Sequence, residues 1–487
     1  MSEVIVSQGK AADAGEREAS RALLGKGSVY TIATAVQLAG ALLVQPALSR
    51  LLPREEYGRV ALAIVVTNLL GLLLTVGLPA VVTREYFRHG TTNSGAVAAR
   101  AVAGIAVSLA LVIGLGVAAV GPLWAAPLGG LDAALLLGAA TAITFSMITT
   151  GQALLRAKGQ AGRFVLVVLL NVVGGQLLGL LAINLLTPDA GHYLAGVGVG
   201  SLLGAALSWG WTRPIAPFHL EGAQVRGWFA IALPTLPHTA ALYLMTAGDR
   251  FVVEVMRGAE QVAGYSLAYL VGALGITLVA AANNAWAPLI YGAPEQRRWA
   301  ILASTTKDMA QLGALLAGGL ALAAPLALWI VADPSKYDIA ALTPVVALTA
   351  LATVPYVLYL ASAHVLFWTG KTTALLWITP LAAAINLGAK ALVLPWGGFA
   401  GAAVVTVAAY GVLALLIGGV RRNLAEVTWS GRGVALGVAT AACVLGAVLP
   451  LNLFGHLVRA FGVAVLLLGA ALIARRLVTS RRGARTA

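Results

Sequence analysis

The chain is a succession of long apolar stretches separated by short polar segments. A helix needs about 20 mostly apolar residues to cross the hydrocarbon core of a bilayer, so stretches free of Asp, Glu, Lys and Arg mark candidate spans. Fourteen such stretches occur, at residues 27–49, 60–83, 101–131, 133–155, 164–188, 190–212, 227–248, 261–294, 309–332, 339–370, 372–389, 391–420, 433–458 and 460–474. The pattern predicts an all-α polytopic membrane protein with about 14 transmembrane helices.

The composition supports the same class of protein. Of the 487 residues, 60% are hydrophobic and only 10% are charged, whereas soluble domains carry about 25% charged residues. The first 26 residues are polar and charged, so we expect no cleavable signal peptide. The one cysteine, Cys443, lies in an apolar run and excludes a disulfide framework or a multi-cysteine metal site.

The net charge of +14 would indicate nucleic-acid binding in a soluble protein. Here Lys and Arg are distributed as in a membrane protein. If the N-terminus is cytoplasmic, 24 of these residues fall on the cytoplasmic side and 8 on the outer side. The positive-inside rule therefore predicts that both termini are cytoplasmic and that the protein lies in the cytoplasmic (inner) membrane. Nucleic acid is not needed to explain the charge.

Two pairs of landmarks indicate an internal repeat. Gly58 and Gly264 each follow the start of an outer loop and are 206 positions apart, while Gly191 and Gly398 are 207 apart. Six spans per repeat give both halves the same orientation, which is a transporter plan with the substrate site between two bundles. The alternative is chance, because Gly and Pro are common in membrane helices. The predicted parts are a polar cytoplasmic segment 1–26, an N-lobe 27–212, a linker 213–226, a C-lobe 227–420, helices 13 and 14 within 421–478, and a basic tail 479–487.

Five basic residues near span ends are candidate ligands of an anionic substrate. They are Arg50, Arg84, Arg156, Arg250 and Lys390. Arginine binds phosphate bidentately, whereas lysine offers a point charge. The alternative is that cytoplasmic bases such as Arg84 and Arg156 serve orientation or contact lipid headgroups. Arg50 and Arg250 lie on the outer side, against the orientation rule, and are the stronger candidates.

Uncharged polar residues inside the spans form a weaker set of candidates. They are Gln152, Asn283, Asn284, His364 and Asn386. Such groups could bind sugar hydroxyls, or they could form hydrogen bonds between helices worth about 0.6–2 kcal/mol each. Pro234 and Pro237 interrupt the seventh span and predict a kink, which would serve as a hinge or only as a bend.

Catalytic and cofactor chemistry has little support in the sequence. It contains no P-loop and no HExxH motif. The adjacent acids Glu55 and Glu56 stand among arginines in a short loop, where local ion pairing explains them. We expect no enzyme activity, no cofactor and no metal. Acids are placed near span ends, so no carboxylate relay for proton or cation coupling is predicted.

Several short motifs occur in an order that resembles a known family. They are Ser49 to Pro53, Tyr57-Gly58, Gly77 to Pro79, Thr83 to Glu85, Asp249-Arg250, Gly264-Tyr265 with Ala268, and Gly370 to Thr372 through Asn386, Pro395, Gly398, Gly401 to Ala403 and Tyr410. Together with fourteen spans, this set resembles the bacterial polysaccharide flippases (O-antigen type) of the multidrug/oligosaccharidyl-lipid/polysaccharide exporter superfamily. The resemblance covers most of residues 20–420.

The resemblance implies movement of undecaprenyl-diphosphate-linked oligosaccharide to the outer leaflet by alternating access, for surface polysaccharide or lipopolysaccharide biosynthesis. It implies that basic residues meet the diphosphate or an anionic sugar, which by position points to Arg50, Arg84 and Arg250. The expected partners are this substrate, membrane lipids and the polymerase and glycosyltransferases of the same pathway, with the flippase itself a monomer. The alternatives are a multidrug or cation antiporter of the same superfamily and a lipid II flippase; an acid-poor interior argues against the antiporter.

Overall fold

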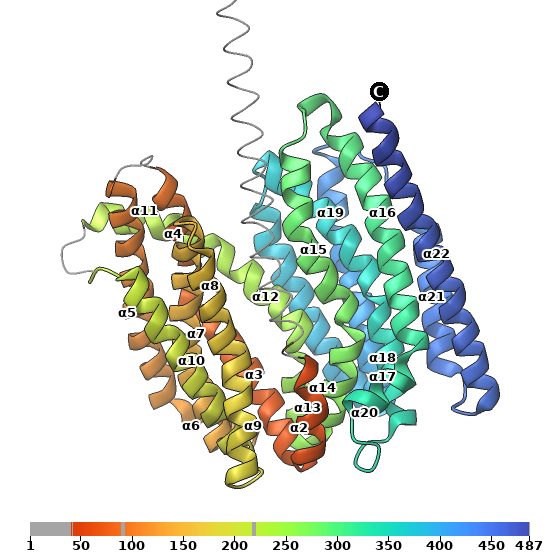
Figure 1. The fold of residues 1–487 in the computed structure, drawn as a ribbon, viewed down its shortest axis with the longest axis horizontal. Helices are drawn as coiled ribbons and strands as arrows, with labels where there is room; N and C mark the ends of the chain where they lie inside the picture. The colour runs from red at the N-terminus through yellow and green to blue at the C-terminus, as the bar shows by residue number, and fades with distance from the viewer. Residues whose placement is uncertain (1–39, 41, 89–92, 217–220, 487) are drawn as a thin grey trace, which may run out of the picture. The chain divides into compact units, whose positions relative to one another are not determined.

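A computed structural model describes residues 40, 42–88, 93–216 and 221–486, and all the regular structure in these ranges is helical (Figure 1). Internal contacts divide the chain into two compact units. Among the described residues, the first unit holds those up to Ala47, Val66–Trp124 and Leu131–Leu236. The second holds Leu48–Val65, Ala125–Gly130 and the chain from Pro237 onward. The lobe limits expected from the repeat, 27–212 and 227–420, stay a prediction.

Helices α2 (Gln45–Leu51) and α3 (Arg54–Thr75) cross the limits of the units. The other elements of the first unit are α4 (Leu78–Arg88), α5 (Asn93–Ala119), α6 (Gly121–Ala125), α7 (Ala133–Ala157), α8 (Ala161–Val168), the π-helix η2 (Leu169–Gly174), α9 (Gly175–Leu185), α10 (Ala190–Thr212), α11 (Gly222–Ala232) and the 3-10 turn η4 (Leu233–Thr235). In this unit α10 packs against both α7 and α9, and α5 packs against α4 and α7.

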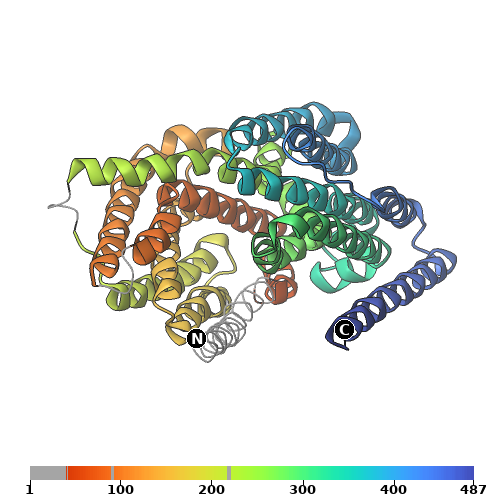
Figure 2. The same cartoon turned by 90° about the horizontal axis from the view of Figure 1, so that it is seen from above.

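The second unit contains the 3-10 turn η1 (Ala126–Leu128), α12 (Leu236–Ala247), α13 (Asp249–Arg257), α14 (Ala259–Gly272), α15 (Leu274–Tyr291), α16 (Glu295–Leu322), α17 (Ala324–Val331), α18 (Ile339–Leu351), α19 (Thr353–Thr369), α20 (Thr373–Arg422), α21 (Arg432–Val448) and α22 (Leu453–Thr486). Helices α16, α18 and α21 pack side by side, and α22 lies against α16 (Figure 2). This packing buries a core of alanine, valine and leucine side chains.

The described residues include 10 helices long and apolar enough to cross a membrane, or up to 11 if the bent pair α16 and α17 is one span. The predicted polytopic helical fold is therefore confirmed, but the count of fourteen stays a prediction. Three features account for the difference. Most of the predicted first span, 27–49, lies outside the described residues; α20 joins the eleventh and twelfth predicted spans; and α21 is only 17 residues long.

Two predicted span limits are wrong because they were placed at charges that the protein buries. Lys390 lies inside α20 at 1% exposure, and the kink of that helix comes later, at Gly398 with a φ of 57°. The thirteenth helix ends at Val448 rather than at residue 458. Arg459 lies inside α22, where its guanidinium donates to the carbonyls of Gly446, Leu449 and Pro450.

Glycines bring α9 and α10 into close contact. A Cβ at Gly200 would lie 2.3 Å from the Cα of Gly175, and a Cβ at Gly196 would lie 2.4 Å from the amide nitrogen of Gly179. Each helix thus presents two glycines four positions apart, the small-xxx-small arrangement that lets membrane helices approach closely. Leucine-sized side chains at these positions would hold the two backbones apart.

We predict that Gly200→Ala destabilises the protein by about 1–3 kcal/mol, because its new methyl group overlaps the backbone of α9. Gly210 lies on the same helix with nothing within 4 Å of its ideal Cβ position, so Gly210→Ala is the matched control and should be neutral or stabilising. Thermal unfolding of the detergent-purified variants measures the difference. Equal melting temperatures for both variants would contradict the close approach.

Asp189 caps the N-terminus of α10. Its carboxylate accepts hydrogen bonds from the backbone N–H of His192 at 2.9 Å, from the His192 ring and from the hydroxyl of Thr187. Partial burial alone would raise the pKa of Asp189, but the hydrogen bonds from Thr187 and His192 lower it below the ordinary value of 3.8. The charged carboxylate is therefore the form that the fold stabilises.

Removing this cap should cost stability in a pH-dependent way. At neutral pH, Asp189→Ala should destabilise the protein by about 1 kcal/mol. The depressed pKa means that the capping contribution is present above about pH 4 and is lost as the pH falls through the lower pKa of the folded state. The difference in melting temperature between Asp189→Ala and the wild type should therefore shrink in acid. A constant difference from pH 7 to pH 3 would show that the charged cap is not the cause.

Candidate functional site

The seam between α20 and the α12–α13 junction gathers several charged side chains of the second unit. Asn386, Lys390 and Leu394 follow one another at intervals of four residues, so they share one face of α20. The Asn386 amide donates to the Met245 carbonyl at 3.3 Å, and Lys390 reaches Asp249. One turn further on, the guanidinium of Arg257 donates to the Leu394 and Pro395 carbonyls.

Asp249 is the centre of this seam, at 1% exposure. Its Oδ2 accepts hydrogen bonds from the Tyr265 hydroxyl at 2.7 Å and from Lys390 Nζ at 3.3 Å. Its Oδ1 accepts from Arg250 at 3.2 Å. The ring of Tyr269 lies 5.0 Å from the Arg250 guanidinium and 5.8 Å from Lys390 Nζ, within cation–π range of both.

The charges of this cluster do not cancel. One carboxylate compensates two cations, Arg250 and Lys390, which leaves a formal surplus of one positive charge. The two cations differ in access, since the Lys390 side chain is 1% exposed and the Arg250 side chain 12%. Lys390 therefore holds Asp249 in place, and Arg250 is the cation better able to reach a further anion.

The sequence analysis located Arg250, Lys390 and Asn386 but did not predict that they meet. It placed Asp249 at a span end, where the structure also has it between α12 and α13, but it did not predict that this carboxylate is buried. The four-residue spacing of Asn386 and Lys390 was the available signal. It remained hidden because Lys390 had been taken as the end of a span.

Arg50 has a different environment from Arg250, although the repeat suggested equivalent places. Its guanidinium donates to the carbonyls of Ile330 at 3.1 Å and Trp329 at 3.5 Å, while the Ser49 hydroxyl donates to the Val331 carbonyl at 2.8 Å. These are the last carbonyls of α17. In return, Lys336 Nζ donates to the Arg50 carbonyl at 2.6 Å, near the end of α2. Cations favour helix C-termini, so Arg50 of α2 caps α17, while Lys336 from the loop between α17 and α18 caps α2.

Arg84 and Arg156 lie in the first unit, on α4 and at the end of α7. The Arg84 guanidinium pairs with the buried carboxylate of Glu85 at 3.0 Å, and Arg88 approaches the same carboxylate at 3.6 Å. Arg156 lies over the ring of Phe164 at 5.6 Å. Both arginines are largely exposed, and their role in binding substrate stays a prediction.

The uncharged candidates do not form one group. Asn284 is exposed on α15, while the Oδ1 of its neighbour Asn283 is buried without a hydrogen-bond partner. Gln152 lies half-buried on α7. His364 is 3% exposed on α19, where its Nδ1 shares a 3.0 Å hydrogen bond with the Tyr291 hydroxyl. Of the five, the structure brings only Asn386 next to the charged seam.

The predicted kink at Pro234 and Pro237 coincides with a change in helix type. The 3-10 turn η4 contains Pro234, and α12 begins beside it with Pro237 as its second residue. The boundary between the two compact units falls between Leu236 and Pro237. A hinge role for these prolines stays a prediction.

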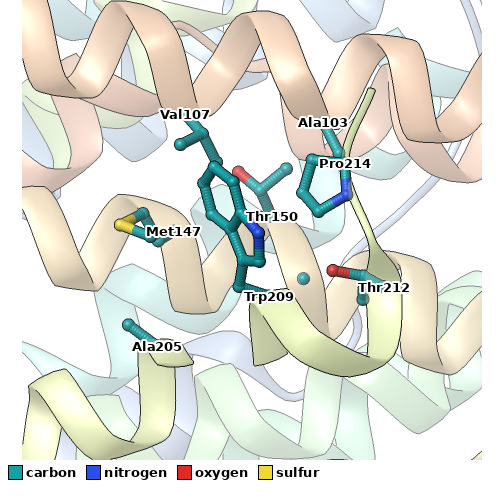
Figure 3. A pocket seen from close by; sticks show the side chains of 9 residues that line it. Ala103, Val107, Met147, Thr150, Ala205, Trp209, Thr212 and Pro214 are labelled. Atoms are coloured by element: carbon teal, nitrogen blue, oxygen red, sulfur yellow. The ribbon is translucent and has the colours of Figure 1, made fainter. Parts of the chain in front are cut away.

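A small pocket in the first unit is not a substrate site. Figure 3 shows the Trp209 indole among Val107, Met147 and Thr150, with Pro214 beside Ala103. Its volume is about 10 Å³, near the minimum for one water molecule and far below the 300–1,000 Å³ of ligand pockets. The described residues also contain no group of three His, Cys, Asp or Glu side chains able to hold a metal ion.

Solved structures with this fold are helical membrane transporters. The lipid II flippase MurJ in an inward closed conformation aligns with a TM-score of 0.68 at 13% identity, covering 92% of this chain and 99% of that chain. An inward-facing multidrug resistance MATE family transporter of the MOP superfamily gives 0.63 at 15% identity, covering 83% and 95%. A MOP superfamily transporter from Pyrococcus furiosus gives 0.55 at 14%, covering 86% and 96%. The fold of this chain is therefore similar to the folds of these three transporters.

The sequence itself defines the family more closely. The family model described as polysaccharide biosynthesis protein matches residues 23–292, which is more than half of the chain. The chain therefore belongs to the polysaccharide biosynthesis protein family, as the ordered set of short motifs predicted. No curated protein sequence matches it.

The seam makes a prediction about charge balance. Asp249→Asn should destabilise the protein by about 3–5 kcal/mol, because it leaves Arg250 and Lys390 buried without a counter-charge. Adding Lys390→Met should recover part of this loss, since one uncompensated cation is then removed. Thermal unfolding of the purified variants measures both effects.

Asp338→Asn is the matched control, because Asp338 is an exposed N-cap of α18 and asparagine caps as well as aspartate. Additive losses for Asp249→Asn and Lys390→Met, with no recovery in the double variant, would show that the pair is not coupled.

Proposed function

We propose that this protein is a flippase that moves undecaprenyl-diphosphate-linked oligosaccharide across the cytoplasmic membrane by alternating access, for synthesis of a surface polysaccharide. The family membership, in a chain with a MOP transporter fold, is the observation that carries the proposal. Both termini would be cytoplasmic, and the protein would act with the polymerase and glycosyltransferases that make and use the glycan.

The charge of the seam supports an anionic substrate. A diphosphate carries negative charge that a surplus cation stabilises, and arginine can bind it through two parallel hydrogen bonds. Arg250 combines this chemistry with residual exposure, whereas Lys390 is enclosed by Asp249 and the Tyr269 ring. In this proposal Arg250 is the residue that contacts the diphosphate, and Asp249 and Lys390 position it.

A multidrug or cation antiporter is the runner-up function, and the burial of Asp249 is the observation that bears on it. A carboxylate that binds a transported cation must be free to exchange its partner. Asp249 instead accepts hydrogen bonds from Arg250, Lys390 and Tyr265 within 3.3 Å, and the cluster is net positive. This environment repels a second cation. A lipid II flippase would recognise the same lipid diphosphate. It differs from the proposed function only in the glycan that the lipid carries.

The proposal predicts that Arg250→Gln lowers flipping of lipid-linked oligosaccharide at least tenfold, while Arg250→Lys retains more of it because the positive charge remains. The assay is movement of the labelled substrate to the outer leaflet of proteoliposomes, with equal amounts of folded protein confirmed by size-exclusion chromatography. Arg226→Gln, which changes an exposed arginine of α11, is the control and should flip at the wild-type rate.

Wild-type flipping by Arg250→Gln would overturn the role of this arginine. Movement of lipid II in preference to the oligosaccharide substrate would favour the cell-wall alternative. Drug or cation exchange without lipid movement would favour the antiporter.

A further inference from the structure

A second cationic site lies in the loop that joins α20 to α21. The pocket has a volume of about 460 Å³ and includes Arg421, Arg422 and Arg432 in its lining, together with Glu426 and Trp429. Its size falls within the range of ligand sites. All of these residues belong to the second unit. The site is distant from the Asp249 seam, because Arg421 comes 31 positions after Lys390 on α20.

Arg421 is the lining residue whose side chain is held in place by buried contacts. It is 5% exposed, its guanidinium donates to the Val427 carbonyl at 2.6 Å, and it lies 4.8 Å from the centre of the Trp429 ring. Its Nε is buried without a hydrogen-bond partner. A buried guanidinium nitrogen with an unused N–H is costly unless an acceptor completes it. The other two arginines, Arg422 and Arg432, are exposed and can close on that acceptor.

The lining carries three arginines against one carboxylate, a surplus of two positive charges. Next to the pocket, Gly431 has a φ of 77° and turns the chain into α21, with the carbon stem of Lys307 packed beside it. Like charges in so small a volume repel one another. A bound anion would offset this repulsion. The Glu426 carboxylate lines the same pocket and repels anions. Only an anion that the arginines bind strongly enough to overcome this repulsion will stay.

Apolar side chains continue from the pocket along both helices. Leu415 on α20 and Val434 on α21 are 75% and 66% exposed. In a membrane-spanning chain such exposed apolar faces meet lipid tails, and an indole such as that of Trp429 is typical of the headgroup level. The pocket thus combines a cationic headgroup site with neighbouring faces suited to acyl chains.

We propose that this pocket binds the phosphodiester headgroup of an anionic phospholipid, such as phosphatidylglycerol or cardiolipin. Arg421 supplies a rigid donor, Arg422 and Arg432 clamp the phosphate oxygens, and Trp429 lies at the boundary with the acyl chains. Basic pockets between membrane helices bind such headgroups on the cytoplasmic side, which is where the distribution of Lys and Arg predicts this loop to lie. The lipid is a bound component of the protein and is distinct from the transported substrate.

The test is lipid binding to the full-length protein in detergent, followed by native mass spectrometry with cardiolipin, phosphatidylethanolamine or inorganic phosphate as the added probe. The double variant Arg422→Gln with Arg432→Gln should bind cardiolipin about thirtyfold more weakly, since each surface cation contributes about 1 kcal/mol. Arg226→Gln should bind it like the wild type. Because both substituted arginines are exposed, the variant should unfold at the wild-type temperature when no lipid is added.

Wild-type affinity for cardiolipin in the double variant would overturn the proposal, as would equal affinity for phosphatidylethanolamine. Displacement of cardiolipin by an equal concentration of inorganic phosphate would reassign the pocket to free anions and would also overturn it. Flipping activity is not the readout, so a negative result here leaves the proposed transport function untouched.

Discussion

A bilayer offers no water to a buried charge, so each one must find a counter-charge or hydrogen-bond acceptors within the protein. In the second unit this requirement falls on Asp249, which compensates Arg250 and Lys390 and accepts a hydrogen bond from Tyr265. The cluster joins the beginning of α13 to α14 and to the middle of α20. This carboxylate, together with the hydrogen bonds from Asn386 to Met245 and from Arg257 to Leu394, ties the kinked helix α20 to α12 and α13, and it leaves a single positive charge uncompensated.

Under the proposed function, this arrangement links stability to substrate binding in one place. A transporter that recognises a diphosphate needs cations that are held in position before the substrate arrives, because a flexible lysine or arginine would lose conformational freedom on binding. Asp249 fixes the two cations in position, and its negative charge compensates one of their two positive charges. Packing against the Tyr269 ring reduces their freedom further. Arg250 is held by Asp249 and the Tyr269 ring, and its side chain keeps 12% exposure.

The helical membrane fold could be predicted from the sequence, since long apolar runs have few other solutions. The limits of helices failed where the sequence rule equated charge with loop. Lys390 and Arg459 are both inside helices, because one finds a carboxylate from α13 and the other finds the carbonyls at the end of α21. Such partners lie far apart in sequence or depend on a turn, so no local pattern reveals them. For the same reason, the candidate site was only partly predicted. Arg250 and Lys390 were recognised as candidate cations, but their common partner Asp249 was not.

The capping of α2 by Lys336, from the loop that follows α17, has a consequence for the order in which the chain matures. The carbonyl of Arg50 accepts a hydrogen bond from the ammonium of Lys336, which is synthesised 286 residues later. At about 5–20 residues per second, translation of that interval takes roughly 15–60 s. During this time the end of α2 must satisfy its carbonyls with water or lipid headgroups. An early helix thus stays unfinished until late in synthesis, and its completion marks the assembly of the second unit.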